Sequence, residues 1–250
     1  MRHVPSVLLL LFALATARAH AAEPTTAPPA ARAEGVKVRI VLVGDSTVAP
    51  NGGWGPGFAP LVSKEAEVVN WAKGGRSSWS FVKEGWWAKA LADKPDYVLI
   101  QFGHNDQKAR GIGDTPPLLA YREWMARLID EARAAGARPV IVTSLTRRLF
   151  KGDKVASNLF EYADAAKAIA AEKKVPVIDL HARSIAELDK IGPRASVALN
   201  YVAKPKDRTP PTDKPDLTHV SPKGAELFGR VVAEELIKAV PELAPYVVIK

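Results

Sequence analysis

VKVRIVLVGDST, residues 36–47, joins a β-branched apolar run to a short polar segment that begins at Gly44. A continuous apolar run is typical of a strand that is buried on both faces of a parallel sheet. In open sheets of this kind, ligands bind beside the carboxyl ends of the strands. We therefore predict a first strand over Val36–Val43, and we expect Ser46 to lie at the edge of the sheet where the chemistry takes place.

Similar apolar runs recur along the chain and alternate with helical patterns. The four further strands that we predict cover Val68–Trp71, Tyr97–Phe102, Pro139–Ser144 and Val175–Leu180. Apolar residues at helical spacing predict helices over Pro117–Ala135 and Leu159–Lys173, and a last helix that begins after Ser221. This alternation predicts an α/β fold, a three-layer α/β/α sandwich around a five-stranded parallel sheet.

Composition limits the class of protein. The chain has 250 residues, of which 47% are hydrophobic and 25% are charged, as expected for one folded domain and not for a disordered or polytopic membrane protein. Cysteine is absent, which excludes disulfides, a cysteine nucleophile and a zinc-thiolate site. The net charge of +8 suits an acidic partner. The basic residues form no cluster and no nucleic-acid motif occurs, so we expect no nucleic-acid partner.

The amino-terminal segment has the three-part pattern of a secretory signal peptide. Arg2 and His3 precede a nearly continuous apolar run over Val4–Ala15, and small residues follow it. The run is shorter than the about 20 residues that a membrane span needs. We therefore expect a signal peptide over residues 1–22, a flexible linker over 23–35 and one domain over 36–250. The expected product is periplasmic or extracellular, without stable membrane association after signal removal.

Ser46 needs a base, because a serine hydroxyl is a weak nucleophile until its proton is removed. His219 lies in the segment PDLTHVS, residues 215–221, three residues after Asp216. A carboxylate at that spacing can bind the imidazole Nδ1–H and leave Nε2 to face the serine. We predict Ser46, His219 and Asp216 as the catalytic residues. Asp179 and His181 form a rival carboxylate–imidazole pair.

Other strand ends offer donors for a tetrahedral oxyanion. The backbone N–H groups of Ser46 and Gly75 and the side-chain amide of Asn105 are the candidates. Asp45 is expected to hydrogen-bond its own turn, and His104 is expected to brace its loop. No spacing of histidines and carboxylates fits a known metal motif, so we expect no metal.

Aromatic and basic side chains near these loops are candidate substrate contacts. Indole rings of Trp54 and Trp79 could stack on a sugar, whereas Trp124 is expected in the core. A guanidinium can hold a uronate carboxylate through two hydrogen bonds. The candidates for that contact are Arg76, Arg147 and Arg148, and one of the last two is also a candidate partner for a core carboxylate.

Four blocks match, in order, those of the SGNH (GDSL-type) hydrolases. They are GDSTV at 44–48, GGRSS at 74–78, GHND at 103–106 and DLTH at 216–219. With NGGWG at 51–55 and DLTHVSPKGA at 216–225, the chain resembles the rhamnogalacturonan acetylesterase group over about residues 37–240. The resemblance implies a flavodoxin-like strand order 2-1-3-4-5 and no cofactor. It also implies Ser46 as nucleophile, His219 as base, Asp216 as its orienting carboxylate, and Gly75 and Asn105 as oxyanion donors.

These observations predict an exported serine esterase that removes O-acetyl groups from an acetylated polysaccharide. By resemblance, that polysaccharide is the rhamnogalacturonan backbone of pectin. Xylan or another acetylated glycan, and acyl lipids or thioesters, are the alternative substrates. A non-catalytic sugar-binding protein is a third possibility, and the complete set of nucleophile, base and oxyanion donors argues against it.

Overall fold

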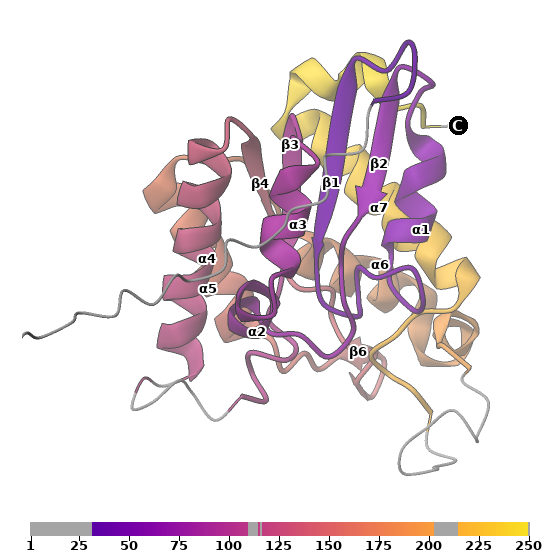
Figure 1. Ribbon diagram of the computed structural model, residues 1–250. Coiled ribbons are helices and arrows are strands. Elements are labelled where there is room, and N and C mark those ends of the chain that lie inside the picture. Colours follow the sequence, from indigo (N-terminus) through magenta and orange to yellow (C-terminus); the bar gives the residue numbers. More distant parts are fainter. Residues whose placement is uncertain (1–31, 110–114, 116, 203–214, 250) are drawn as a thin grey trace, which may run out of the picture.

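The computed structural model describes residues 32–109, 115, 117–202 and 215–249 (Figure 1). Within these residues, a parallel sheet of five strands has the order β2-β1-β3-β4-β7. The predicted fold and strand order are confirmed, since β7 is the fifth strand of this sheet along the chain. The expected signal peptide lies outside the described residues, as do residues 23–31 of the expected linker. The strands are β1 Val38–Gly44, β2 Ala66–Asn70, β3 Tyr97–Gln101, β4 Arg138–Val142 and β7 Val177–Ile178.

The central strands are buried on both faces, which explains their unbroken apolar runs. Every residue of β1 and β3 is buried, and Ile40 of β1 lies in register between Val68 of β2 and Tyr97 of β3. The edge strand β7 is shorter than the predicted run Val175–Leu180. Asp179 accepts a hydrogen bond from the backbone N–H of Ala182 and so starts a helix where the sequence pattern predicts strand.

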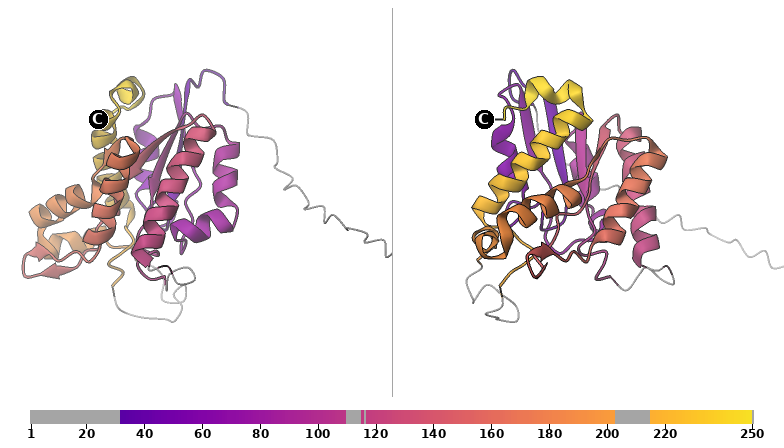
Figure 2. Two further views of the ribbon diagram at one scale, coloured as in Figure 1. Left: turned by 90° about the vertical axis from the view of Figure 1, so that its left-hand side faces the viewer. Right: turned by 180° about the vertical axis from the view of Figure 1, so that it is seen from behind.

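Helices cover both faces of the sheet (Figures 1 and 2). One face packs against α2, α3, α4 and α5, and the other packs against α1, α6 and α7. Their bounds are α1 Gly55–Phe58, α2 Ser78–Lys83, α3 Trp86–Ala92, α4 Pro117–Ala134, α5 Phe160–Lys173, α6 Leu180–Ala195 and α7 Pro222–Ala239. A small antiparallel hairpin of β5 (Phe150–Lys151) and β6 (Lys154–Val155) follows β4. Among the described residues, no helix has the length and apolar character needed to cross a membrane.

Helix α7 and helix α1 approach each other backbone to backbone. A Cβ atom on Gly57 would lie 1.9 Å from the carbonyl oxygen of Ala225, and one on Gly229 would lie 2.3 Å from the carbonyl carbon of Gly57. Only glycine allows this approach. The start of α7 is as predicted, because the Ser221 side chain accepts a hydrogen bond from the Gly224 N–H. This close packing fixes the segment just before α7, which contains Asp216 and His219.

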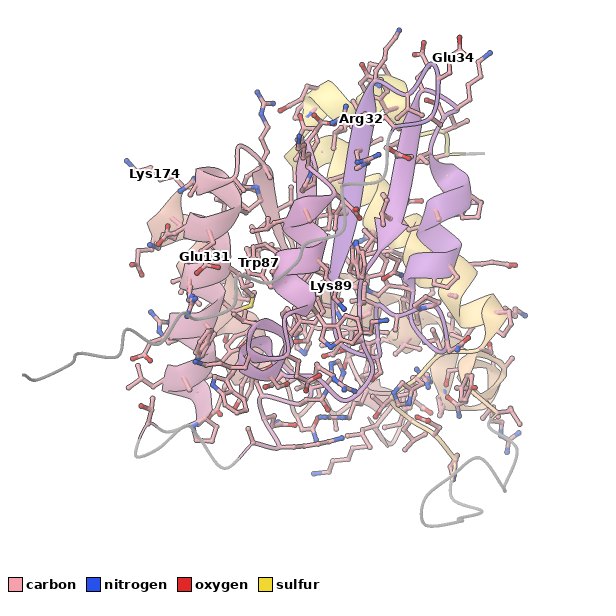
Figure 3. The ribbon with its side chains drawn as sticks, in the orientation of Figure 1. Arg32, Glu34, Trp87, Lys89, Glu131 and Lys174 are labelled. Carbon is pink, nitrogen blue, oxygen red and sulfur yellow. The ribbon has the colours of Figure 1, made fainter. Side chains whose placement is uncertain are left out.

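On the opposite face, a buried indole links α3 to α4. Trp87 Nε1 donates a hydrogen bond of 2.8 Å to Glu131 Oε2, and Figure 3 shows the two residues on these neighbouring helices. The Trp87 side chain is otherwise buried against the sheet. The link holds α3 against α4, whose first turns border the carboxyl ends of the strands.

Candidate active site

Two hydrogen bonds at the carboxyl edge of the sheet connect Ser46 to His219 and His219 to Asp216. Ser46 Oγ is 2.7 Å from His219 Nε2, and His219 Nδ1 is 2.7 Å from Asp216 Oδ2. Ser46 follows β1, whereas the other two residues precede α7. The His219 side chain is 32% exposed, so a substrate can reach this group from solvent.

Asp216 is held as an anion by its neighbours. Its Oδ1 atom accepts hydrogen bonds of 2.9 Å from the backbone N–H groups of Thr218 and His219. Burial alone would raise the pKa of Asp216, but the hydrogen bonds from His219 and Thr218 outweigh it and hold that pKa well below its ordinary value. An ionised Asp216 favours the tautomer with a proton on Nδ1, which leaves Nε2 to accept the Ser46 proton.

Arg148 clamps the segment that carries Asp216 and His219. Its Nη2 atom donates to the carbonyl oxygen of Asp216 at 3.0 Å and also to that of His219, and its Nε atom donates to Asn200 Oδ1. The backbone N–H of Arg148 donates to the carbonyl of Leu217 at 2.9 Å. The side chain is 3% exposed, and burial lowers its pKa to about 10. The expectation that Arg148 holds a substrate carboxylate is therefore wrong, because its guanidinium faces the loop inside the protein.

The oxyanion candidates lie on two loops that border Ser46. A Cβ atom on Gly74 would lie 3.6 Å from Ser46 Cβ, which places the loop between β2 and α2 beside Ser46. Gly75 has a φ of +79°, a conformation that glycine adopts readily, and it is exposed. Asn105, after β3, donates from Nδ2 to the carbonyl of Arg76 at 3.0 Å. That bond uses one of the two Nδ2–H groups and leaves the other as a donor.

Asp106 joins these two loops, a role that sequence analysis did not predict. Its Oδ1 atom accepts from Ser78 N at 3.0 Å and from Ser78 Oγ at 2.5 Å, and its Oδ2 atom accepts from Gly103 N at 3.0 Å. Burial raises the pKa of Asp106 to about 6, although these hydrogen bonds oppose that rise. The GHND block contains Asp106, but nothing in the sequence pairs it with Ser78, 28 residues away.

Two buried polar residues, Asp45 and His104, lie close to Ser46. Asp45 Oδ1 accepts from Thr47 N at 2.8 Å and from Thr47 Oγ1 at 2.7 Å, so the prediction that it binds its own turn is confirmed. The His104 ring is buried, and its Nδ1 atom lies 3.6 Å from Asp45 Oδ2. Neither ring nitrogen has a hydrogen-bond partner among the described residues, so His104 fills space beside Asp45 and does not brace its loop by a ring hydrogen bond.

The rival pair of Asp179 and His181 is engaged in other contacts. Asp179 caps α6 and accepts from Thr143 Oγ1 at 2.9 Å. His181 Nε2 lies 2.7 Å from Ser157 Oγ, and its ring packs edge-on against Phe160. Each side chain is thus satisfied separately, and the pair offers no base directed at Ser46.

The tryptophans differ from expectation at two positions. Trp54 has no exposed surface, and its Nε1 atom donates to Gln101 Oε1 at 2.8 Å. The expectation that Trp54 stacks on a sugar is therefore wrong, because its ring has no free face. Trp124, expected in the core, is partly exposed and lines a surface pocket together with Trp79. Trp79 is 37% exposed and remains a candidate sugar contact.

Arg76 and Arg147 brace loops. Arg147 is 8% exposed, and its Nη1 atom donates to Gln107 Oε1 at 2.8 Å and to Asn158 Oδ1 at 2.7 Å. A direct contact of Arg147 with a uronate is thus wrong as well. Neither Arg147 nor Arg148 makes an ion pair with a carboxylate of the described residues. Arg76 pairs with Glu84 at 2.8 Å and is partly exposed, so a substrate contact there stays a prediction. Within the described ranges, no cluster of three or more His, Asp or Glu side chains is suited to a metal ion.

Comparisons with known proteins give one consistent family. The model of the GDSL-like lipase/acylhydrolase family matches residues 42–227. The chain is 43% identical to the rhamnogalacturonan acetylesterase RhgT of Bacillus subtilis over 209 residues, 79% of this chain and 88% of that protein. It is 31% identical over 204 residues to YesY of the same organism, named a probable rhamnogalacturonan acetylesterase, with 78% and 90% of the two chains covered.

Solved structures share the fold. The acetylxylan esterase Axe2 of Geobacillus stearothermophilus matches with a TM-score of 0.60 at 21% identity, over 81% of this chain and 95% of that one. The YxiM protein of Bacillus subtilis matches with a TM-score of 0.67 at 24% identity, over 84% of this chain and 59% of that one. At these identities the matches describe the architecture alone.

Proposed function

The chain belongs to the GDSL-like lipase/acylhydrolase family, and from this membership we propose that it deacetylates rhamnogalacturonan through a Ser-His-Asp acyl-enzyme mechanism. It is a carboxylic ester hydrolase that acts on the acetyl groups of carbohydrates. The observation that carries the mechanism is the unbroken line of 2.7 Å contacts from Ser46 through His219 to Asp216. Two relatives named as rhamnogalacturonan acetylesterases support the substrate.

Acylation begins when His219 Nε2 takes the Ser46 proton and Ser46 Oγ attacks the acetyl carbonyl carbon. The negative charge on the carbonyl oxygen is met by the N–H groups of Ser46 and Gly75 and by the second Nδ2–H of Asn105. Each such donor contributes about 3–4 kcal/mol to transition-state stabilisation. His219 then protonates the sugar oxygen, which leaves as a free hydroxyl, and the acetyl group stays on Ser46.

Deacylation repeats these steps with water. His219 removes a proton from a water molecule, whose oxygen attacks the acetyl carbonyl, and the same donors stabilise the second tetrahedral intermediate. The proton returns from His219 to Ser46 Oγ, and acetate leaves. Asp216 remains ionised throughout, because its pKa is held well below its ordinary value, and it stabilises the imidazolium at both stages.

Export and an anionic substrate complete the proposal. The three-part pattern of residues 1–22 supports removal of a signal peptide and a periplasmic or extracellular product. After removal of residues 1–22, which contain Arg2 and Arg18 and no acidic residue, the net charge is +6, and this charge favours a polyanionic glycan over a neutral one. Expression of the full chain in a bacterial host, followed by amino-terminal sequencing of the secreted fraction, tests export, and a product that begins at Met1 would contradict it.

Acetate release by the purified protein tests the substrate. We expect release from acetylated rhamnogalacturonan and little from acetylated xylan. With 4-nitrophenyl acetate, Ser46→Ala should lower kcat by roughly 10⁶-fold while the circular dichroism spectrum is unchanged. Release from xylan alone would overturn the rhamnogalacturonan assignment and keep the mechanism. Full turnover of 4-nitrophenyl acetate by Ser46→Ala would overturn the mechanism.

A further inference from the structure

A pocket opens directly beside the oxyanion residues. This pocket, here called the Trp79 pocket, has a volume of about 370 Å³. Ligand sites for small molecules are typically about 300–1,000 Å³. The residues that matter for the argument are Gly75, Trp79, Asn105, Lys108, Tyr121 and Trp124. Because Gly75 and Asn105 belong to both the pocket and the oxyanion loops, a sugar chain whose acetyl group reacts at Ser46 would extend into this pocket.

Two indole rings from different helices line the pocket. Trp79 of α2 is 37% exposed, and it is one of the few large apolar side chains on the described surface. Trp124 of α4 is partly exposed, and cations already flank its ring: Arg127 lies 4.8 Å and Lys83 lies 5.7 Å from the ring centroid. Indole combines a rigid apolar face with a polar N–H, which suits the C–H face of a pyranose ring.

The accessible charge of the lining is positive. Lys108 is exposed, and its position is fixed by a turn in which its backbone N–H and that of Ala109 donate to the Asn105 carbonyl at 3.2 and 3.0 Å. Asp106 is the one carboxylate among the described lining residues, and it is 4% exposed with its oxygens bound to Ser78 and Gly103. Among the described lining residues, the pocket therefore presents an accessible cation and no accessible anion.

We propose that the Trp79 pocket is a subsite for an acidic sugar residue of the substrate chain. The ring of that residue stacks on Trp79 and Trp124, and its carboxylate pairs with Lys108. This inference rests on the proposed function, since it names where that enzyme binds an acidic residue of its polysaccharide. It assigns discrimination between acidic and neutral glycans to Lys108, which the four sequence blocks do not include.

Kinetics on three substrates test the subsite. They are acetylated rhamnogalacturonan oligosaccharides, acetylated xylo-oligosaccharides and 4-nitrophenyl acetate. For Lys108→Ala we expect a KM about fivefold higher on the acidic oligosaccharide, with the other two substrates unaffected. For Trp79→Ala we expect about a tenfold rise of KM on both oligosaccharides and none on 4-nitrophenyl acetate. Lys64→Ala is the matched control, because Lys64 is an exposed lysine just before β2, at the opposite edge of the sheet.

Binding without turnover separates the subsite from the proposed function. We would titrate deacetylated rhamnogalacturonan oligosaccharides into Ser46→Ala and follow tryptophan fluorescence and heat of binding. Weaker binding after the added change Lys108→Ala or Trp79→Ala supports the subsite, even if the wild type releases no acetate from rhamnogalacturonan and the proposed function fails. Unchanged affinity in both double variants overturns the subsite, even if acetate release is normal.

Discussion

The two loops that meet at Ser46 are held by buried charges of opposite sign. On the oxyanion side, the Asp106 carboxylate accepts from Ser78 and Gly103. On the base side, the Arg148 guanidinium donates to the carbonyls of Asp216 and His219. A buried anion gathers N–H groups and a buried cation gathers carbonyls, so each loop is fixed through the peptide atoms that the charge can bind. Such preorganisation places the catalytic groups before substrate arrives, and no reorganisation is needed during reaction.

The pKa values of the carboxylates on these two loops are shifted in opposite directions. Burial raises the pKa of Asp106 to about 6. Asp216 is also partly buried, but hydrogen bonds from His219 and Thr218 more than offset the burial and hold its pKa well below the ordinary value. The difference teaches that the partner of a carboxylate, and not its burial alone, decides its charge. An imidazole partner keeps Asp216 charged, whereas Asp106 has only neutral hydroxyl and amide donors.

Among changes to these two loops, the largest loss of activity should come from a substitution of Asp216, on the loop that carries His219. Asp216→Asn keeps the shape of the side chain but presents an amide to His219 Nδ1 and favours the wrong tautomer. We expect kcat on 4-nitrophenyl acetate to fall about 10⁴-fold at pH 7, with little change of the melting temperature. A loss below tenfold would mean that His219 acts without its carboxylate. Steady-state kinetics over pH 5–9 would show this directly.

A second test concerns stability on the oxyanion side. The folded protein holds a proton on Asp106 up to about pH 6, whereas the unfolded chain loses it near pH 3.8. Between these values the folded state binds more protons, so the free energy of unfolding falls as pH rises, by at most about 3 kcal/mol for a shift of about two pKa units. Asp106→Asn should remove this slope.

Urea unfolding of both proteins from pH 4 to pH 8 gives the measurement. The wild type should lose stability relative to Asp106→Asn between about pH 4 and pH 6 and run parallel to it above that range. A difference that does not vary with pH would contradict the raised pKa of Asp106. Asp216 has the opposite sign, since its stabilising contribution is present at neutral pH and is lost only as pH falls through its depressed pKa.

Among changes to these two loops, the smallest effect should be the loss of activity in Arg148→Lys. Lysine keeps the charge but cannot donate to Asp216, His219 and Asn200 from one planar fork. We expect kcat to fall about tenfold to a hundredfold, because the base shifts relative to Ser46, while KM stays the same.

Arg147→Lys is the matched control for this test. Arg147 lies in the same loop as Arg148, after β4, and is also buried, but its hydrogen bonds go to Gln107 and Asn158. Its variant should lower kcat much less than Arg148→Lys does. A rise of KM without a loss of kcat in Arg148→Lys would mean that Arg148 binds substrate and does not position the base.

Most of the long elements were predictable because their patterns repeat over many residues, whereas α6, with 16 residues, was not predicted. The central strands, α4, α5 and α7 each bury a continuous run or stripe. Helices α2 and α3 have 6 and 7 residues, too short for a periodic pattern to stand out. The run at Val175–Leu180 misled for a different reason, since the capping hydrogen bond of Asp179 outweighs the strand preference of its neighbours.

Some residues of the candidate site were also predictable from the sequence, and others were not. Ser46 was predictable because it directly follows a strand, and Asp216 and His219 were predictable because they lie three residues apart on one loop. The burial of Trp54 and Arg148 was not, because a tryptophan in a glycine-rich segment and an arginine after a strand are ordinarily at least partly exposed. Their places depend on Gln101 and on the carbonyls of a distant loop, contacts that local sequence does not encode.

The hydrogen bond between Ser46 and His219 spans 173 residues of chain. A ribosome adds about 5–20 residues per second, so roughly 10–30 s separate the synthesis of the nucleophile from that of its base. During that interval the nascent polypeptide has a serine that nothing can deprotonate. Under the proposed mechanism, the enzyme is thus silent while it is being made, and it becomes active only when the segment before its last helix docks beside Ser46.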